Sequence, residues 1–142
     1  MTNPFKYSNT NKRYHTLDYY YKNKFNEKVF KISLDAGFSC PNIDGTVGYN
    51  GCIYCSKLGS GEFAGDKTEP IEVQFNKVKE IMLKKWSKAK YIGYFQAHTN
   101  TYAPVKKLKK LYEKILSQED VVGLNIATRP DAISNECLDY LE

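Results

Sequence analysis

Three short apolar runs separated by two amphipathic segments constrain the fold of this chain more than any other feature. The runs are rich in β-branched and aromatic residues, have the length of buried strands, and cover residues 29–34, 91–96 and 121–127. The segments between them, 70–88 and 104–116, place apolar residues three or four positions apart, as amphipathic helices do. This alternation predicts an α/β fold built on a parallel sheet.

The predicted elements amount to only three β/α units. A further helix is expected from Ser134, and its apolar spacing continues to the last residue. Three units are too few to close a barrel, which ordinarily takes eight strands. We therefore expect residues 1–142 to be the truncated N-terminal portion of one domain, with an extension over 1–28 and the units over 29–142. The third strand is expected to be an unpaired edge that promotes self-association.

The sequence gives no sign of a membrane helix or of export. The chain has no apolar run near the ~18 residues that a membrane helix needs, and its first residues lack the apolar stretch of a secretory signal. We expect a cytoplasmic protein with no membrane partner. A net charge of +5 permits an acidic partner such as RNA. Among the 12 tyrosines, the cluster Tyr19–Tyr21 is interpreted as packing on a short helix after Thr16, with base stacking as the alternative.

Residues 35–69 form a long segment without periodicity, rich in Gly, Asn and Ser, between the first strand and the first long helix. Long loops in compact domains are usually functional. This one contains Cys40, Cys52 and Cys55, and loops that follow parallel strands converge at one end of the sheet. The three thiols are therefore expected to face a pocket.

The cysteine spacing suits a metal centre. Two residues separate Cys52 from Cys55, and glycines in the preceding interval let Cys40 fold back toward them. Three ligands favour an iron-sulfur cluster with one open iron over a structural zinc site, which normally has four. Cys137 is expected to be a buried core thiol, and His98 is a rival fourth ligand.

Two alternatives stay open on the residues alone. One is a zinc-stabilised nucleic-acid-binding module, in which the Lys-rich segment 104–116 and the tyrosines contact phosphates and bases. The other is a thiol-disulfide oxidoreductase that uses Cys52 and Cys55, although that motif usually opens a helix.

The cysteine loop resembles the cluster loop of radical S-adenosylmethionine (SAM) enzymes. Cys40 is followed by Pro41, and an aromatic residue, Tyr54, precedes the last cysteine of Cys52-Ile-Tyr-Cys55. Eleven residues separate the first two cysteines. Most members of the superfamily have about three there, and the longer interval is similar to that of the Elongator catalytic-subunit group.

The resemblance extends along most of the chain. Residues 31–42, 94–102 and 123–131 are similar to a bacterial family of predicted iron-sulfur oxidoreductases. The resemblance implies that the chain is the first half of a partial (β/α)6 TIM-like barrel. It also implies a [4Fe-4S] cluster on Cys40, Cys52 and Cys55, with SAM on the fourth iron.

The implied reaction is reductive cleavage of SAM to methionine and a 5′-deoxyadenosyl radical, with the electron supplied by a donor such as flavodoxin or ferredoxin. The resemblance does not identify the substrate, and tRNA is a candidate by analogy with the Elongator-like group.

Further cofactor contacts follow from the resemblance and from the positions of polar residues at strand ends. The resemblance places Tyr54 against the adenine of SAM and the turn of Gly59, Ser60 and Gly61 near its methionine part. Ribose and carboxylate contacts are expected from polar residues after the second and third strands, namely Gln96, His98, Asn100, Asn125, Thr128, Arg129 and Asp131. The alternative for each of these is a turn or cap.

Overall fold

The sheet of this protein has three parallel strands. In the computed structural model, which describes residues 5–6 and 8–142, the strand order is β1 (Val29–Leu34), β2 (Lys90–Phe95) and β3 (Val121–Ile126). β1 and β3 are the two edges of this sheet, and each pairs with β2. The predicted α/β class and parallel sheet are confirmed, and each strand begins and ends within one residue of its prediction.

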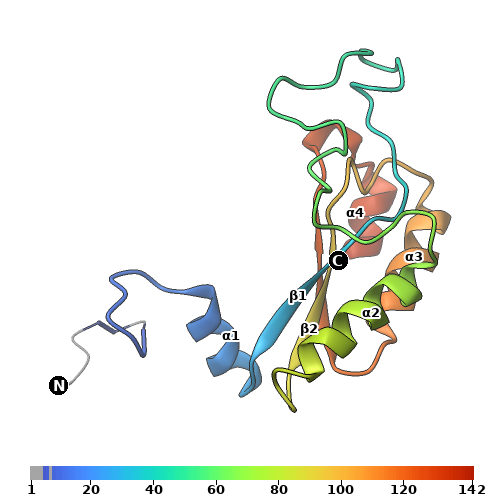
Figure 1. Cartoon of the computed structure of the whole chain (residues 1–142). Helices are drawn as coiled ribbons and strands as arrows, with labels where there is room; N and C mark the ends of the chain where they lie inside the picture. The colour runs from blue at the N-terminus through green and yellow to red at the C-terminus, as the bar shows by residue number, and fades with distance from the viewer. Residues whose placement is uncertain (1–4, 7) are drawn as a thin grey trace.

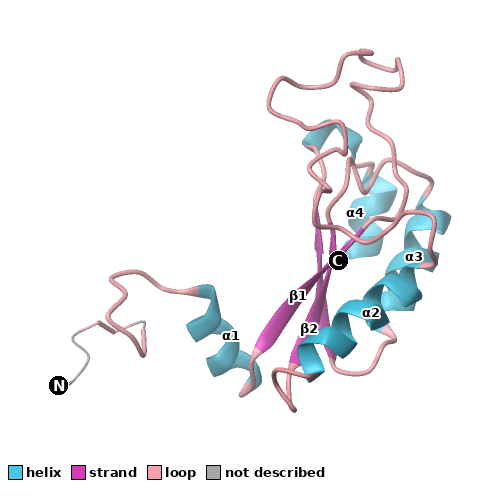
Figure 2. Ribbon diagram, in the orientation of Figure 1, coloured by secondary structure: helices cyan, strands magenta, loops and turns pink. Residues whose placement is uncertain are grey.

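Two long helices cover one face of the sheet. α2 (Ile71–Leu83) packs on β1, and α3 (Val105–Leu116) packs on β3 and on α2. The short 3-10 helix η1 (Pro130–Ala132) leads into α4 (Asn135–Leu141), which lies against α3. Figure 2 shows the long helices to one side of the strands. The predicted order of strands and helices is therefore the observed one.

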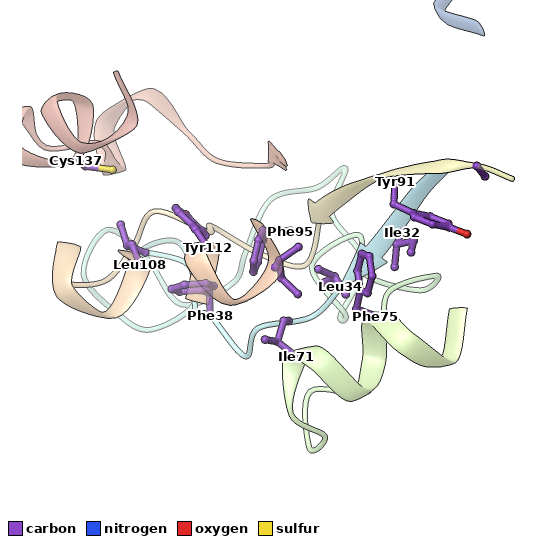
Figure 3. Packing of buried hydrophobic residues seen from close by; sticks show 12 residues of the cluster. Ile32, Leu34, Phe38, Ile71, Phe75, Tyr91, Phe95, Leu108, Tyr112 and Cys137 are labelled. Carbon is purple, nitrogen blue, oxygen red and sulfur yellow. The ribbon is translucent and has the colours of Figure 1, made fainter. Parts of the chain in front are cut away.

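The hydrophobic core lies between the sheet and these helices (Figure 3). It holds alternate residues of the strands, such as Ile32 and Leu34 in β1, and the inward stripes of α2 and α3, including Phe75 and Leu108. Period-two burial in β1 is the pattern of a strand with one face on the core. Cys137 is 1% exposed and belongs to this cluster, so the predicted core thiol is confirmed.

The predicted helix over 70–88 is too long at its C-terminal end. α2 ends at Leu83, and Trp86 lies beyond it, with its ring centroid 4.8 Å from that of Phe30. The tryptophan continued the apolar spacing because it packs on the start of β1, not because the helix continues. The two helices begin at Ile71 and Val105, one residue later than predicted, because Pro70 and Pro104 are their N-cap residues.

The N-terminal extension forms the helix α1 (Leu17–Phe25), which lies apart from the other helices near the start of β1 (Figure 1). The Thr16 side chain accepts a hydrogen bond from the Tyr19 N–H, so a helix after Thr16 is confirmed. None of its residues is buried. The tyrosines Tyr19–Tyr21 therefore pack on neighbouring aromatic rings of the extension and not in the core.

A single buried glutamine closes the base of loop 35–69. Gln74 of α2 is 2% exposed, and its Oε1 accepts a hydrogen bond from Asp35 N–H at 3.0 Å. Its Nε2 donates to the carbonyls of Asp35, Asp66 and Glu69 at 2.8–3.0 Å. One side chain thus ties the two ends of the loop to the sheet and to α2, while the loop itself projects beyond the strand ends (Figure 1). Across the described residues, no helix is long and apolar enough to span a bilayer.

Candidate functional site

A pocket of about 470 Å³ lies where loop 35–69 meets the carboxyl ends of β2 and β3. Cys40, Cys52 and Cys55 all line this pocket, and all three are free, partly exposed thiols. Ligands of parallel α/β sheets bind at this edge because the loops that follow the strands converge there. The structure thus brings the three predicted ligands to one pocket.

Backbone turns fold the interval between Cys40 and Cys52 back on itself. Gly45 and Gly51 adopt positive φ angles of 93° and 68°, which side chains other than glycine rarely tolerate. The Gly51 N–H donates to the Asn42 carbonyl at 2.9 Å, directly before Cys52. These turns return the chain to the neighbourhood of the first cysteine, as the glycine spacing predicted.

Cys40 is surrounded by hydrogen-bond donors. Burial disfavours its thiolate, but the Thr99 hydroxyl, the Asn42 N–H and the Arg129 guanidinium outweigh burial and lower the pKa of the Cys40 thiol. Arg129 Nη1 lies 3.9 Å from Cys40 Sγ. Because the thiolate is the form that binds metals, this environment favours ligation.

Cys52 and Cys55 occupy one tight turn. The Cys55 N–H donates to the Cys52 carbonyl at 3.0 Å, and Asn42 Nδ2 donates to Cys52 Sγ at 2.9 Å. Ser60 Oγ lies 3.7 Å from Cys55 Sγ. A hydrogen bond with the Cys52 sulfur is the main cause that raises the pKa of the neighbouring Tyr54 phenol. Each cysteine sulfur therefore has a polar partner that can support a bound metal from outside its ligand shell.

The turn of Gly59, Ser60 and Gly61 joins the cysteine loop to the end of β2. The His98 N–H donates to the Gly59 carbonyl at 3.0 Å, and Gln96 Nε2 donates to the Ser60 carbonyl at 2.6 Å. Gly59 has a φ of +59°, and a Cβ on it would lie 2.4 Å from His98 Nδ1. This close approach requires glycine and holds the turn against the strand end.

The strand-end polar residues separate into two groups. Those that line the pocket are Gln96, His98, Thr128, Arg129 and Asp131, together with Gly59, Ser60 and Tyr54 from the loop. Asn125 instead lies within β3, in register with Tyr94 of β2, and neither it nor Gly61 is among the lining residues. Asn100 is fully buried, and its Nδ2 donates to the carbonyls of Ala97 and Ala127, both at 3.0 Å. The alternative to a cofactor contact, a role in the turns at the strand ends, therefore holds for Asn100, which links the ends of β2 and β3.

Candidate fourth ligands occupy different places. Cys137 lies in the core and does not line the pocket, whereas His98 lines the pocket with the three cysteines. Over residues 5–6 and 8–142, no three His, Cys, Asp or Glu side chains are grouped so that they can hold a metal ion.

Two donors near the sulfurs were not singled out from the sequence. Asn42 contacts Cys52, and Thr99 is a partner of Cys40. The signal for Asn42 was its place two residues after the first cysteine in Cys40-Pro-Asn. Thr99 gave no such signal, because its role depends on how the end of β2 meets the loop.

Alkylation tests the difference between the pocket thiols and the core thiol. Iodoacetamide applied to the folded, reduced chain at about pH 8 is expected to modify the three pocket cysteines and to spare Cys137. Burial raises the pKa of the Cys137 thiol, so this residue stays protonated and unreactive at that pH. Intact-mass spectrometry counts the additions, and unfolding in urea should expose the fourth site. Equal modification of all four cysteines in the folded chain would contradict this placement.

Comparisons with known proteins identify relatives that are much longer than this chain. It is 55% identical over 141 residues to "Uncharacterized protein YtqA" of Bacillus subtilis, covering 99% of this chain and 44% of YtqA. It is 42% identical over 125 residues to "Uncharacterized protein MJ0486" of Methanocaldococcus jannaschii, covering 86% of this chain and 37% of that protein. It is 37% identical over 118 residues to "Protein YhcC" of Escherichia coli, covering 83% of this chain and 37% of YhcC.

No protein-family model matches the chain, and no solved structure matches it. The chain spans less than half the length of YtqA, MJ0486 and YhcC. Its similarity to YtqA covers almost all residues of the chain.

Proposed function

We propose that this chain is part of a radical SAM enzyme in which Cys40, Cys52 and Cys55 hold a [4Fe-4S] cluster. The observation that carries the proposal is the position of three free cysteines on one pocket, at the carboxyl edge of a parallel sheet. The resemblance of the loop to radical SAM cluster loops supports the same assignment.

The donor set suits such a cluster. The three thiolates of a [4Fe-4S] cluster bind three different irons, so they surround a pocket instead of meeting at one point. Three cysteines leave the fourth iron open to an outside ligand, whereas a structural zinc site uses four protein ligands. Donors to the sulfurs, such as Asn42 on Cys52, are the outer contacts that orient ligands and tune iron-sulfur centres.

Residues around the cysteines have the chemistry to contact SAM. Tyr54 is 86% exposed and lines the pocket, so its ring is available to stack on a planar group such as adenine. Gly59, Ser60 and Gln96 line the same pocket, and the hydrogen bond from Gln96 Nε2 to the Ser60 carbonyl fixes the turn that the resemblance assigns to the methionine part of SAM. When bound, the reduced cluster and SAM together supply a 5′-deoxyadenosyl radical, and the protein binds, orients and shields the reactants.

The finer part of the proposal is the barrel. We infer that the three parallel β/α units are the first half of a partial (β/α)6 barrel and that the remaining units belong to the longer polypeptide seen in the relatives. Asn125 and Gly61 do not line the pocket, so the cofactor contacts expected of them would require the complete barrel. Further strands would pair with the open edge of β3.

An RNA substrate is supported by the N-terminal extension. Residues 1–28 contain six of the chain's 21 Lys and Arg residues and two of its 16 Asp and Glu residues, which gives this segment +4 of the net +5. Aromatic rings contact one another along α1 and just before it, with centroid distances of 5.6 Å for His15–Tyr19, 5.5 Å for Tyr20–Tyr21 and 6.0 Å for Tyr21–Phe25. Positive charge combined with aromatic platforms is typical of surfaces that bind single-stranded RNA. The zinc-stabilised nucleic-acid-binding module remains the second candidate, and it would contact RNA through the Lys-rich helix α3 together with the tyrosines.

RNA binding by the extension has a measurable signature. Replacing Lys12, Arg13, Lys22 and Lys24 with alanine is expected to weaken binding of a single-stranded RNA at least about tenfold at 50 mM salt and to flatten its salt dependence. A comparison variant replaces Lys106, Lys109 and Lys110 on α3 and should leave binding unchanged within about twofold, whereas weaker binding of this variant would favour the second candidate. Salt-independent affinity of the unaltered chain, measured by fluorescence anisotropy, would rule out this role.

The enzymatic proposal is tested by product analysis. The assay uses a polypeptide that contains this chain and has the length of its relatives. After reconstitution with iron and sulfide and reduction with dithionite, it should convert SAM to 5′-deoxyadenosine. Cys52→Ala in the same protein should reduce the amount of 5′-deoxyadenosine to the background formed from SAM without protein. Colourless protein with one tightly bound zinc would favour the second candidate instead.

A further inference from the structure

Arg129 is held in one orientation by its neighbours on the loop after β3. Its backbone is extended, with φ −126° and ψ 146°, as the following Pro130 favours. Its Nε and Nη2 donate to the two carboxylate oxygens of Asp131 at 2.6 and 2.7 Å. This bidentate pair is the geometry in which guanidinium and carboxylate planes align. The side chain is therefore positioned before any ligand arrives.

The remaining arm of the guanidinium faces the first cysteine. Nη1 of Arg129 lies 3.9 Å from Cys40 Sγ, while Asp131 occupies the other edge of the group, at Nε and Nη2. The positive end of the ion pair thus points toward the sulfur and its negative end points away. The Arg129 side chain is 24% exposed, so water screens this contact only in part.

We propose that Arg129 is a positioning residue that holds positive charge against the Cys40 sulfur and thereby raises the reduction potential of the cluster, an inference that rests on the proposed function. Reduction adds one negative charge to the cluster. A cation and a hydrogen bond at a ligand sulfur stabilise that added charge, and these are two of the properties that set iron-sulfur potentials.

This role differs from the one expected from the sequence, in which Arg129 binds the cofactor carboxylate. A carboxylate is recognised by two parallel donors of the guanidinium. In Arg129 the Nε and Nη2 pair already binds Asp131, and Nη1 faces Cys40. The bidentate edge is occupied within the protein itself, so the arginine acts through the cysteine and not on SAM.

The test measures the cluster potential without SAM. The reconstituted chain is titrated electrochemically and followed by electron paramagnetic resonance. Arg129→Met and Arg129→Gln both remove the charge, and glutamine keeps a polar side chain in case methionine disturbs folding. Either variant should shift the reduction equilibrium about tenfold toward the oxidised cluster, which equals about 59 mV for one electron. Arg129→Lys keeps the positive charge but lacks the planar, bidentate guanidinium, and it should shift the equilibrium less.

The matched control is Arg13→Met, which removes the chain's other arginine from the N-terminal extension and should leave the potential unchanged. An unchanged potential in the Met or Gln variant, with weaker SAM binding, would overturn the inference and restore the carboxylate role while leaving the proposed function intact. A wild-type chain that takes up no cluster would overturn both.

Discussion

Replacing Cys40 with alanine is expected to reduce the iron bound after anaerobic reconstitution from about four atoms per chain to less than one. Cys40 is the proposed ligand that lies apart from the other two in the sequence, and turns stabilised by glycines return the chain from it to Cys52. Without its thiolate, only the two sulfurs of one tight turn remain, and two ligands do not retain a cubane. Iron and sulfide are measured chemically, and the loss of visible absorption reports the same event.

The control for this experiment is the fourth cysteine. Cys137→Ala removes a thiol of the same chemistry from the core, so it should lower stability while leaving the iron content near that of the wild type. If Cys137→Ala lost iron while Cys40→Ala kept it, the ligand set would be wrong. Chain with stoichiometric zinc that survives Cys40→Ala would favour a different centre altogether.

Replacing Gln74 with leucine is expected to destabilise the fold by about 3 kcal/mol, because the substitution removes four partly buried hydrogen bonds of a buried side chain. The leucine has similar size but neither donates nor accepts. The lost hydrogen bonds are those to Asp35, Asp66 and Glu69, which join both ends of loop 35–69 to α2. The loop that carries the cysteines should loosen along with the global loss of stability.

Urea unfolding measures this change. Gln118→Leu provides the control, because Gln118 makes one hydrogen bond to the Lys114 carbonyl at the end of α3, and its loss should cost under about 1 kcal/mol. Equal effects of the two substitutions would show that Gln74 does not close the loop. In the Gln74→Leu chain, faster alkylation of Cys40, Cys52 and Cys55 should accompany the lower stability.

The sequence predicted the regular elements well because local periodicity reports burial. The strands were found to within a residue, since each is a compact apolar run between polar turns. The helix over 70–88 was overextended because Trp86 kept the apolar spacing while packing on Phe30. In α1, the tyrosines share helical spacing with core residues but are not buried, because spacing fixes which side chains share a face and not what covers that face.

The shared pocket of the three cysteines was predicted from the sequence, whereas several contacts that hold this site together were not. Cys40, Cys52 and Cys55 could be assigned to one pocket because their loop follows a strand of a parallel sheet. The contacts of Gln74 with Asp35 join residues 39 positions apart, and no local pattern encodes such a pairing. The pairing of Arg129 with both Asp131 and Cys40 likewise depends on how two loops meet.

In the proposed centre, three thiolates leave one iron of a [4Fe-4S] cluster open to SAM. This arrangement is tested by electron paramagnetic resonance of the reconstituted, dithionite-reduced chain, recorded before and after addition of SAM. We expect the signal of a reduced [4Fe-4S] cluster, and we expect this signal to change when SAM is added. A chain that gives no such signal although fully loaded with metal, or a signal that SAM leaves unaltered, would contradict it.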